Sequence, residues 1–445
     1  MIFESELSSY LYVLPFIGIL LSISLGPVLF PQIWHSHYYR ISLFWLAISL
    51  LLMIGKFGVA ITGGQWIHML LHEYVPFILM IASLYTVTGG IHIVIKTRAK
   101  ARTNTLFLLI GGFLASFIGT TGAAMLLIRP LIEMNRHRKH KVHLIIFFIF
   151  IVANIGGSLT PLGDPPLFLG YLQGIPFWWP MEHLFFPVAK MLFVLLAVFW
   201  IIDSYLLRQE PAQPKARANG ERRLHISGFR NFPILIGIVL SVWMFGSWDS
   251  APHLGVLNLT WAGIGRDLML LSLAILSWTI TPKTIRHYNS YSWEPFKEVA
   301  KLFIGIFTTI IPVVQMLHQG EQGLFARVLR LANPGGVPDN TLYFWLTGWL
   351  SAFLDNAPTY LVFYHMAGGD AVTLSTTMTS TLMAISAGAV FMGAMTYIGN
   401  APNFMVKAIA EKQHIKMPTF FGYMAWSCLI LLPCFALFCW FFLYG

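Results

Sequence analysis

The chain has 445 residues, of which 57% are hydrophobic and only 10% are charged. Soluble domains carry roughly 25% charged residues, so this composition excludes a soluble globular protein and predicts a polytopic membrane protein. The formal net charge of +10 does not indicate a nucleic-acid partner, because the basic residues lie in short loops between apolar runs, as the positive-inside rule describes. The expected partner is instead a lipid bilayer.

Eight apolar runs are long enough to cross about 30 Å of hydrocarbon as continuous helices. They lie near residues 10–32, 42–61, 75–95, 184–206, 231–247, 264–281, 301–318 and 418–443. All three cysteines fall in the last run, so they indicate neither a disulfide framework nor a metal site.

The segment 105–132 is apolar but is expected not to cross the membrane. Basic residues flank it on both sides, with Lys96, Arg98, Lys100 and Arg102 before it and Arg129, Arg136, Arg138, Lys139 and Lys141 after it. If both flanks are cytoplasmic, the segment enters and leaves the membrane on the same side. We therefore expect a re-entrant hairpin with its tip near "GTTGAA" (119–124).

The next segment, 143–173, is expected to form a discontinuous helix. It contains "NIGGSLTPLGDPP" (154–166), which has three glycines and three prolines in thirteen residues. Proline removes a backbone donor and glycine tolerates unusual dihedral angles, so a helix breaks there. Exposed backbone inside a membrane is stable only where it is buried in protein or lines a polar cavity. Asp164 lies within this break.

Both segments recur in the second half of the chain. "AFLDNAPTYLV" (352–362) aligns with "FIGTTGAAMLL" (117–127), which pairs Asp355 with Thr121, and "TYIGNAPNF" (396–404) aligns with "TPLGDPPLF" (160–168), which pairs Asn400 with Asp164. The alignment predicts a duplication, with a second hairpin at about 341–366 and a second broken helix at about 375–412.

Each copy is expected to cross the membrane five times, because the hairpin contributes no crossing. An odd number inverts the second copy relative to the first. The predicted fold is therefore an all-α polytopic membrane protein of two inverted-topology repeats, 1–207 and 231–445. The repeats are joined by a basic cytoplasmic linker, 208–230.

Asp164 and Asp355 are the two acids at the repeat-related breaks. A carboxylate at the centre of a bilayer costs about 2.5–3.5 kcal/mol, so it is retained where it meets a cation, a proton or a water-filled cavity. Neighbouring side chains add hard oxygen ligands of the kind that suit Na⁺, namely those of Thr120, Thr121, Asn154, Thr160, Asn356, Thr396 and Asn400. These residues form the candidate ion- and proton-binding site. The structural alternative is that they only cap the broken helices.

Other polar residues in the apolar runs have simpler explanations. Lys407 is a counter-charge to an aspartate or, as we favour, a residue that extends to the membrane surface. His68, His72 and Glu73 form an "HxxxHE" pattern without a third ligand nearby, which favours an interfacial helix face over a metal site. His92 is interpreted as a buried core histidine rather than a proton relay.

The segments "ANIGGSLTPLGDPPLFLG" and "FLDNAPTYLVF…YIGNAPNF" resemble the paired signature segments of the ion transporter superfamily, in its citrate-transporter-like and sodium/proton antiporter-like bacterial branch. Dicarboxylate transporters of that superfamily carry a Ser-Asn-Thr signature at both hairpin tips. Here the tips read "GTTGAA" and "LDNAPT", so the first lacks the asparagine and the second gains an acid. A second carboxylate repels an anionic substrate and suits a cation.

The resemblance and the two acids together predict a secondary active Na⁺/H⁺ antiporter of the bacterial inner membrane, with Na⁺ and H⁺ as transported ions and no cofactor or resident metal. The alternative is a cation-coupled carrier of citrate or another small organic anion. A membrane-embedded enzyme has only the "HxxxHE" pattern in its favour, and the chain lacks a Walker A loop that would indicate a primary pump. A homodimer is left open.

Overall fold

The computed structural model describes residues 7, 9–96, 100–210, 223–248, 253–254 and 259–443. Up to residue 210, the helices and strand are α1 (Leu14–Leu29), α2 (Pro31–Met69), α3 (Val75–Thr88), β1 (His92–Lys96), α4 (Ala101–Ile118), α5 (Thr120–Met134), α6 (Val142–Ile151), α7 (Pro165–Leu172) and α8 (Trp179–Arg208). From residue 223 they are β2 (Arg223–Ser227), α9 (Asn231–Gly246), β3 (His253–Leu254), β4 (Leu259–Thr260), α10 (Trp261–Ile280), α11 (Lys283–Tyr288), α12 (Glu294–His318), α13 (Ala326–Ala332), α14 (Asn340–Phe353), α15 (Asn356–Met366), α16 (Ala371–Thr376), α17 (Thr379–Met392), α18 (Ala401–Lys412) and α19 (Phe420–Phe442).

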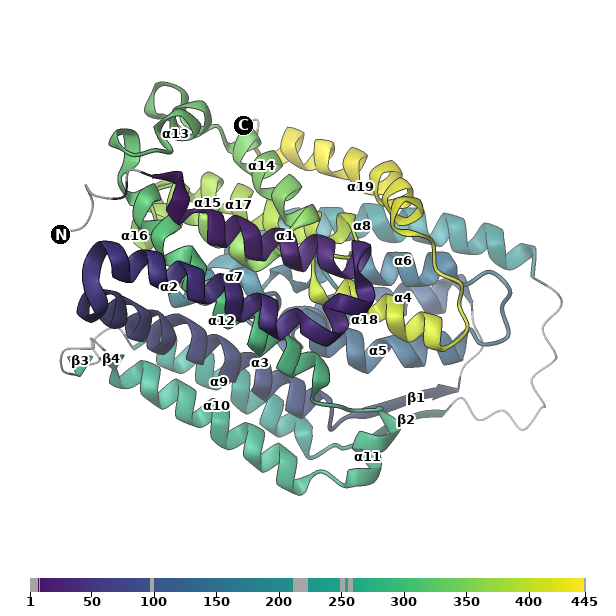
Figure 1. Cartoon of the computed structure of the whole chain (residues 1–445). Helices are drawn as coiled ribbons and strands as arrows, with labels where there is room; N and C mark the ends of the chain where they lie inside the picture. The colour runs from purple at the N-terminus through teal and green to yellow at the C-terminus, as the bar shows by residue number, and fades with distance from the viewer. Residues whose placement is uncertain are drawn as a thin grey trace.

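Within the described residues, seven helical stretches are long and apolar enough to cross a membrane. The long helices run roughly parallel to one another in Figure 1. By length and composition these stretches are candidate spans, and the chain is a helical polytopic membrane protein. One of them is α4, Ala101–Ile118, which belongs to the segment 105–132 that is expected not to cross the membrane.

Two short antiparallel β-ribbons depart from the predicted all-α fold. β1 pairs with β2, with His92 opposite Ser227, and β3 pairs with β4. The prediction of a span at 75–95 was wrong at its end, because α3 stops at Thr88 before two glycines and the β-branched run "HIVIK" follows as a strand. Part of the predicted linker 208–230 is strand β2, and its residues 211–222 lie outside the described residues.

Helix α2 is longer than the predicted span 42–61. It covers 39 residues and bends at Gly58, where φ is 79°. That left-handed angle is accessible to glycine at little cost, so Gly58 lets one helical run change direction. A π-helical turn, Leu70–Tyr74, then leads into α3.

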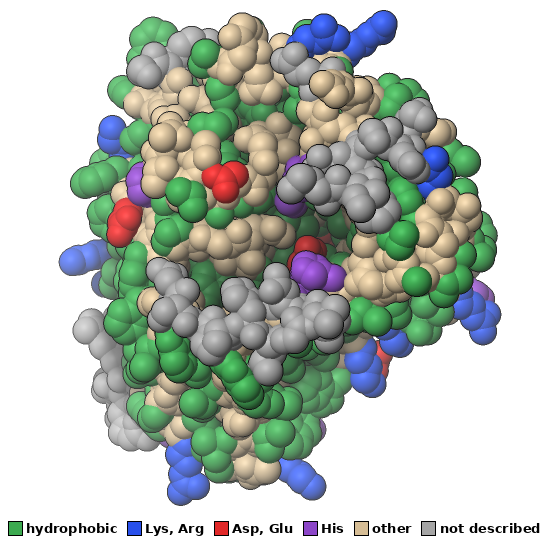
Figure 2. Space-filling view, turned by 90° about the vertical axis from the view of Figure 1, so that its left-hand side faces the viewer, with side chains coloured by type: hydrophobic (Ala, Val, Ile, Leu, Met, Phe, Trp, Pro, Cys, Tyr) green, Lys and Arg blue, Asp and Glu red, His purple; other side chains and the backbone are tan. Residues whose placement is uncertain are grey.

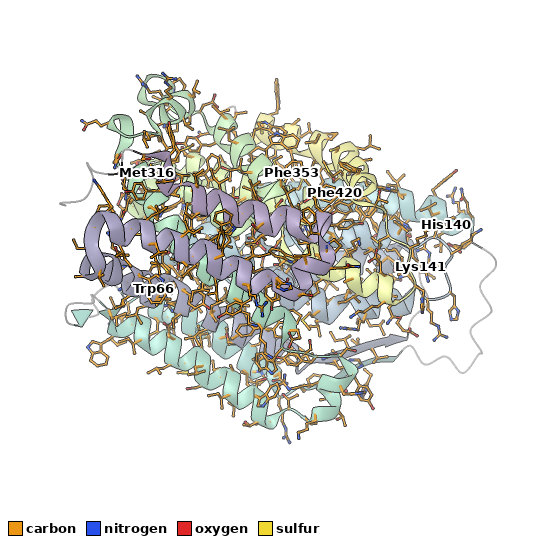
Figure 3. All side chains as sticks on the ribbon, viewed as in Figure 1. Trp66, His140, Lys141, Met316, Phe353 and Phe420 are labelled. Carbon is orange, nitrogen blue, oxygen red and sulfur yellow. The ribbon has the colours of Figure 1, made fainter. Side chains whose placement is uncertain are left out.

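The two predicted hairpins correspond to α4–α5 and α14–α15, and they belong to opposite ends of the molecule (Figure 1). One end carries β1, β2 and α11, and the opposite end carries β3, β4 and α16; we call them the β1–β2 end and the β3–β4 end. His140 and Lys141, which follow the first hairpin, lie at the β1–β2 end, whereas Trp66 and Met316 lie toward the β3–β4 end (Figure 3).

The helices next to the chain breaks pack across the two halves. Helix α6 is buried on every side from His143 to Ile151, as expected of an apolar helix at the centre of a bundle. α18 packs against α5 and α6, and α7 packs against α15. The break in each half therefore lies against the hairpin of the other half.

Candidate functional site

Asp164 is the N-cap residue of α7. Its backbone is extended, with φ of −132° and ψ of 143°, and Pro165 and Pro166 begin the helix. Proline is well suited to the first turn of a helix, where no backbone donor is needed, and it disfavours a helical conformation in the residue before it. The two prolines thus fix the start of α7 and leave Asp164 at the N-terminus of the helix, where the residue is 1% exposed.

Three side chains from three other elements donate hydrogen bonds to the Asp164 carboxylate. Oδ1 accepts from the Thr120 hydroxyl at 2.8 Å and from the Asn400 amide at 3.1 Å, and Oδ2 accepts from the Asn356 amide. All three donors are neutral. The carboxylate is therefore buried with its hydrogen bonds made, but these bonds bring no positive charge to it.

The same residues bring four helix N-termini to one place. Thr120 and Asn356 are the first residues of α5 and α15, and Asp164 and Asn400 are the N-caps of α7 and α18. The positive ends of four helix dipoles therefore meet at the carboxylate, where they stabilise negative charge.

The side-chain amide of Asn356 contributes one unsatisfied atom. Its nitrogen donates to Asp164, while its buried oxygen, Oδ1, has no hydrogen-bond partner. A buried polar atom without a partner costs about 1–3 kcal/mol. An amide oxygen is also a hard ligand for a cation, so Asn356 presents one beside the buried carboxylate.

A second layer of amides supports the first. The Asn400 amide also donates to Asn154 Oδ1 at 3.1 Å, and the Asn154 amide donates to Asn403 Oδ1 at 2.7 Å. The Asn403 amide donates in turn to the backbone oxygens of Gly393 and Thr396, at 2.8 and 2.9 Å. This chain of bonds ties the Asp164 carboxylate to the second break.

Asn403 was not predicted from the sequence. Asn403 lies three residues after Asn400 and aligns with Leu167 in the first half (403 − 236 = 167). Because Leu167 is apolar, comparing the two repeats did not mark this position as part of a polar site. Its place in "GNAPNF", next to a break, was the available signal.

Thr160 and Thr396 do not contact the carboxylate. Their hydroxyls donate to the backbone oxygens of Ser116 and Ala352, which lie near the ends of α4 and α14. Both hydroxyls also accept backbone amide bonds, for example from Gly399 at 3.0 Å. In this structure the two threonines fasten the breaks to the hairpins.

Asp355 and Thr121 lie at the edge of the cluster. The Asp355 carboxylate accepts from the backbone amide of Ala357 at 3.1 Å and is partly exposed. It is near enough to Asp164 for the two charges to interact. Thr121 is partly exposed and is not a donor to Asp164. Helices α5 and α15 begin at Thr120 and Asn356, 236 residues apart, so the predicted pairing of Asp355 with Thr121 is two residues out of register.

The remaining sequence candidates lie away from this cluster. Lys407 pairs with Glu411 at 3.0 Å. The rings of His68 and His72 stack with centroids 4.1 Å apart, and no group of three or more His, Cys, Asp or Glu side chains in the described residues is arranged to hold a metal ion. His92 lies on strand β1 rather than in a span, within 2.8 Å of Asn289 Oδ1.

A buried ionic network near the β1–β2 end was also missed. Asp203 of α8 pairs with Arg138 at 2.6 Å and with His143 at 2.7 Å, and Asn104 of α4 donates to its other oxygen at 3.0 Å. An acid inside the predicted span 184–206 was the signal for it. The network joins the base of the first hairpin to α8.

Comparison with known proteins bears on the whole chain. The family model described as "Putative citrate transport" matches residues 4–443, which confirms the resemblance carried by the two signature segments. A search of the curated proteins finds no match. Because the family match covers nearly the full length, the chain belongs to this citrate-transport family of membrane transporters.

Proposed function

We propose that this transporter exchanges Na⁺ for H⁺ at Asp164. The observation that carries the proposal is a fully buried carboxylate whose three hydrogen-bond donors are all neutral. A buried charge without a counter-charge is costly, so the site is stabilised by whichever cation, Na⁺ or H⁺, occupies it. Competition for one carboxylate is what couples the two ions.

The Asn356 amide lets the same site serve both ions. Beside an ionised Asp164, its nitrogen donates to the carboxylate and its oxygen is left for a bound cation. Beside a protonated Asp164, the amide can rotate so that its oxygen accepts the new O–H group. Asp355, within electrostatic range, adds negative charge that favours a cation.

We also propose that the two halves are inverted repeats that move the site between the two sides of the membrane. Two matched clamps support this. The Thr160 hydroxyl donates to a backbone oxygen 44 residues earlier in the chain, and the Thr396 hydroxyl also donates to a backbone oxygen 44 residues earlier. The two threonines are 236 residues apart (396 − 160 = 236). The hairpins belong to opposite ends in Figure 1, which is the arrangement that secondary transporters with inverted repeats use.

A second candidate is a cation-coupled carrier of citrate or a similar organic anion. The four helix N-termini that meet at Asp164 favour it, because the positive ends of broken helices bind anionic substrate groups in other transporters. The description of the family also favours it. In this version, Na⁺ at Asp164 neutralises the carboxylate and the anion binds beside it.

Binding measurements on purified protein separate the two candidates. We expect Na⁺ to bind without any organic anion and its affinity to weaken as the pH falls, because protons compete for the carboxylate. The control is the Asp164→Asn variant, which cannot take up the proton. If Na⁺ binds at no pH until citrate is added, exchange is wrong and the carrier takes its place.

A further inference from the structure

A hollow opens on the face of the molecule at the β3–β4 end. Figure 2 shows acidic and histidine side chains inside it. Its volume is about 520 Å³, and its polar lining consists of Gln65, His68, Glu73, Gln315, His318 and His365. This hollow is separate from the Asp164 cluster, none of whose residues line it.

Two amide oxygens of the lining have no hydrogen-bond partner. Oε1 of Gln65 and Oε1 of Gln315 are both buried and unsatisfied. They come from α2 and α12, which pack against each other, and Glu73 follows α2 on the π-helical turn. A carboxylate and two amide oxygens are hard ligands that suit Na⁺ better than a transition metal.

The hollow is linked to Asp164 by two helices. The Gln173 side chain lies near the Glu73 carboxylate. Gln173 is the C-cap residue of α7, and Asp164 is its N-cap residue. Leu361 and His365, from α15, also line the hollow, and α15 begins at Asn356. Eight residues of α7 correspond to about 12 Å of helix, so the hollow lies one short helix away from the carboxylate.

We propose that this hollow is a second cation site, in which Glu73, Gln65 and Gln315 hold Na⁺ on its way between the β3–β4 face and Asp164. The inference rests on the proposed function for its physiological role. Its binding chemistry is independent of Asp164. The lining also includes the apolar side chains of Leu361, Ile310 and Val314.

The test measures ²²Na⁺ binding to the purified full-length chain carrying Asp164→Asn and Asp355→Asn, which removes both aspartates of the inner site. We expect Na⁺ binding to remain, and to be lost or weakened at least tenfold when Glu73→Gln and Gln315→Met are added. Glu182→Gln is the matched control, because Glu182 is an exposed acid in the first turn of α8 that does not line the hollow.

The outcomes also distinguish this inference from the proposed function. If the wild-type protein binds Na⁺ and the double aspartate variant binds none, the proposal of a cation site in the hollow is wrong, but Asp164 remains the proposed site. Residual binding that survives Glu73→Gln and Gln315→Met also overturns it. In otherwise wild-type protein, Glu73→Gln should raise the KM for Na⁺ several-fold with little change in kcat, and Glu73→Asp should restore much of the affinity. A loss of folded protein without a change in KM would mean that Glu73 is structural and would overturn its role.

Discussion

At the level of single residues, Asp164 combines two properties that rarely occur together. Its carboxylate is fully buried, and its donors are a hydroxyl and two amides. Hydrogen bonds to a charged group contribute about 1.5–3 kcal/mol each, which offsets a large part of the burial cost without neutralising the charge. The remaining negative charge is available to a mobile cation.

Replacing either aspartate by asparagine should abolish Na⁺-dependent proton movement. The amide keeps the shape of the side chain but cannot bind and release a proton. For Asp164→Asn and Asp355→Asn we expect exchange at background level, measured with a pH-sensitive dye in proteoliposomes, with protein yield and helical content unchanged. Wild-type exchange in one variant would remove that aspartate from the mechanism.

At the level of the elements, close backbone approach shapes both breaks. A Cβ added at Gly163 would lie 2.0 Å from the backbone oxygen of Gly157, and one added at Gly399 would lie 2.6 Å from that of Gly393. Both distances are shorter than the non-bonded contacts that Cβ atoms make with oxygen. The glycine pairs let the chain cross itself tightly enough to place Asp164 and Asn400 at the N-termini of α7 and α18.

Gly163→Ala should therefore destabilise the protein. Overpacking costs typically about 1–3 kcal/mol, so we expect a Tm several degrees lower in a thermal-shift assay in detergent. Gly63→Ala is the matched control, because nothing lies within 4 Å of a Cβ at that helical position, and its Tm should be equal or slightly higher. Equal Tm values for Gly163→Ala and wild type would mean that the break is loosely packed.

Another local contact fixes the loop that follows the first hairpin. The Glu210 carboxylate accepts the backbone amides of Lys139 and His140 at 2.8 and 2.7 Å. Partial burial raises the pKa of Glu210, but these two amide bonds outweigh it, with help from the nearby positive charges, and hold the pKa below its ordinary value. The carboxylate thus stabilises the loop in its ionised form.

The sign of this shift predicts how the loop responds to acid. Because the folded-state pKa is depressed, the stabilisation is complete above the unfolded pKa of about 4.3 and is lost as the pH falls through the lower folded value. Hydrogen exchange at the amides of Lys139 and His140, corrected for the intrinsic rate, should be slow at pH 7 and lose protection below about pH 4. Glu210→Gln should lose protection at pH 7, since a glutamine has one acceptor oxygen for two amides, whereas the exposed Glu133→Gln should not. Unchanged protection in Glu210→Gln would exclude the contact.

The sequence indicated which residues would lie together at the candidate site better than it indicated their contacts. Asp164 and Asn400 were named from the breaks, because Gly and Pro interrupt a helix in a recognisable way, and Thr120 and Asn356 were named from the hairpin tips. That Thr160 bonds to a backbone oxygen rather than to the carboxylate depends on how the halves pack. Sequence spacing does not encode that packing. The β1–β2 ribbon was missed for a similar reason, since its two strands lie more than 120 residues apart in the chain.

At the level of the whole molecule, the basic loops predict its orientation. Residues 96–102, 129–141 and 208–230 are rich in Lys and Arg, and β1, β2, His140 and Lys141 all lie at one end (Figures 1 and 3). The positive-inside rule places that end in the cytoplasm. The hollow at the opposite end would then face outward.

Thiol labelling tests this orientation. Single cysteines at Lys100, Lys139 and Lys215, in a background without the three native cysteines, should resist an impermeant reagent added outside intact cells, while a cysteine at Glu182 should react. Lys215 lies outside the described residues and tests the linker by sequence alone. Labelling at position 139 but not at position 100 would mean that segment 105–132 crosses the membrane, and the inverted-repeat arrangement would fall.

The hydrogen-bond donors of Asp164 are synthesised at different times during translation. Thr120 is synthesised before Asp164, but Asn356 and Asn400 follow it by 192 and 236 residues. At about 5–20 residues per second, ribosomes need roughly 12–50 s to reach Asn400. During that interval the nascent chain holds this acid with one of its three native donors. The candidate site is therefore complete only after the second half has been synthesised. A chain truncated between the two halves would leave Asp164 without the donors Asn356 and Asn400.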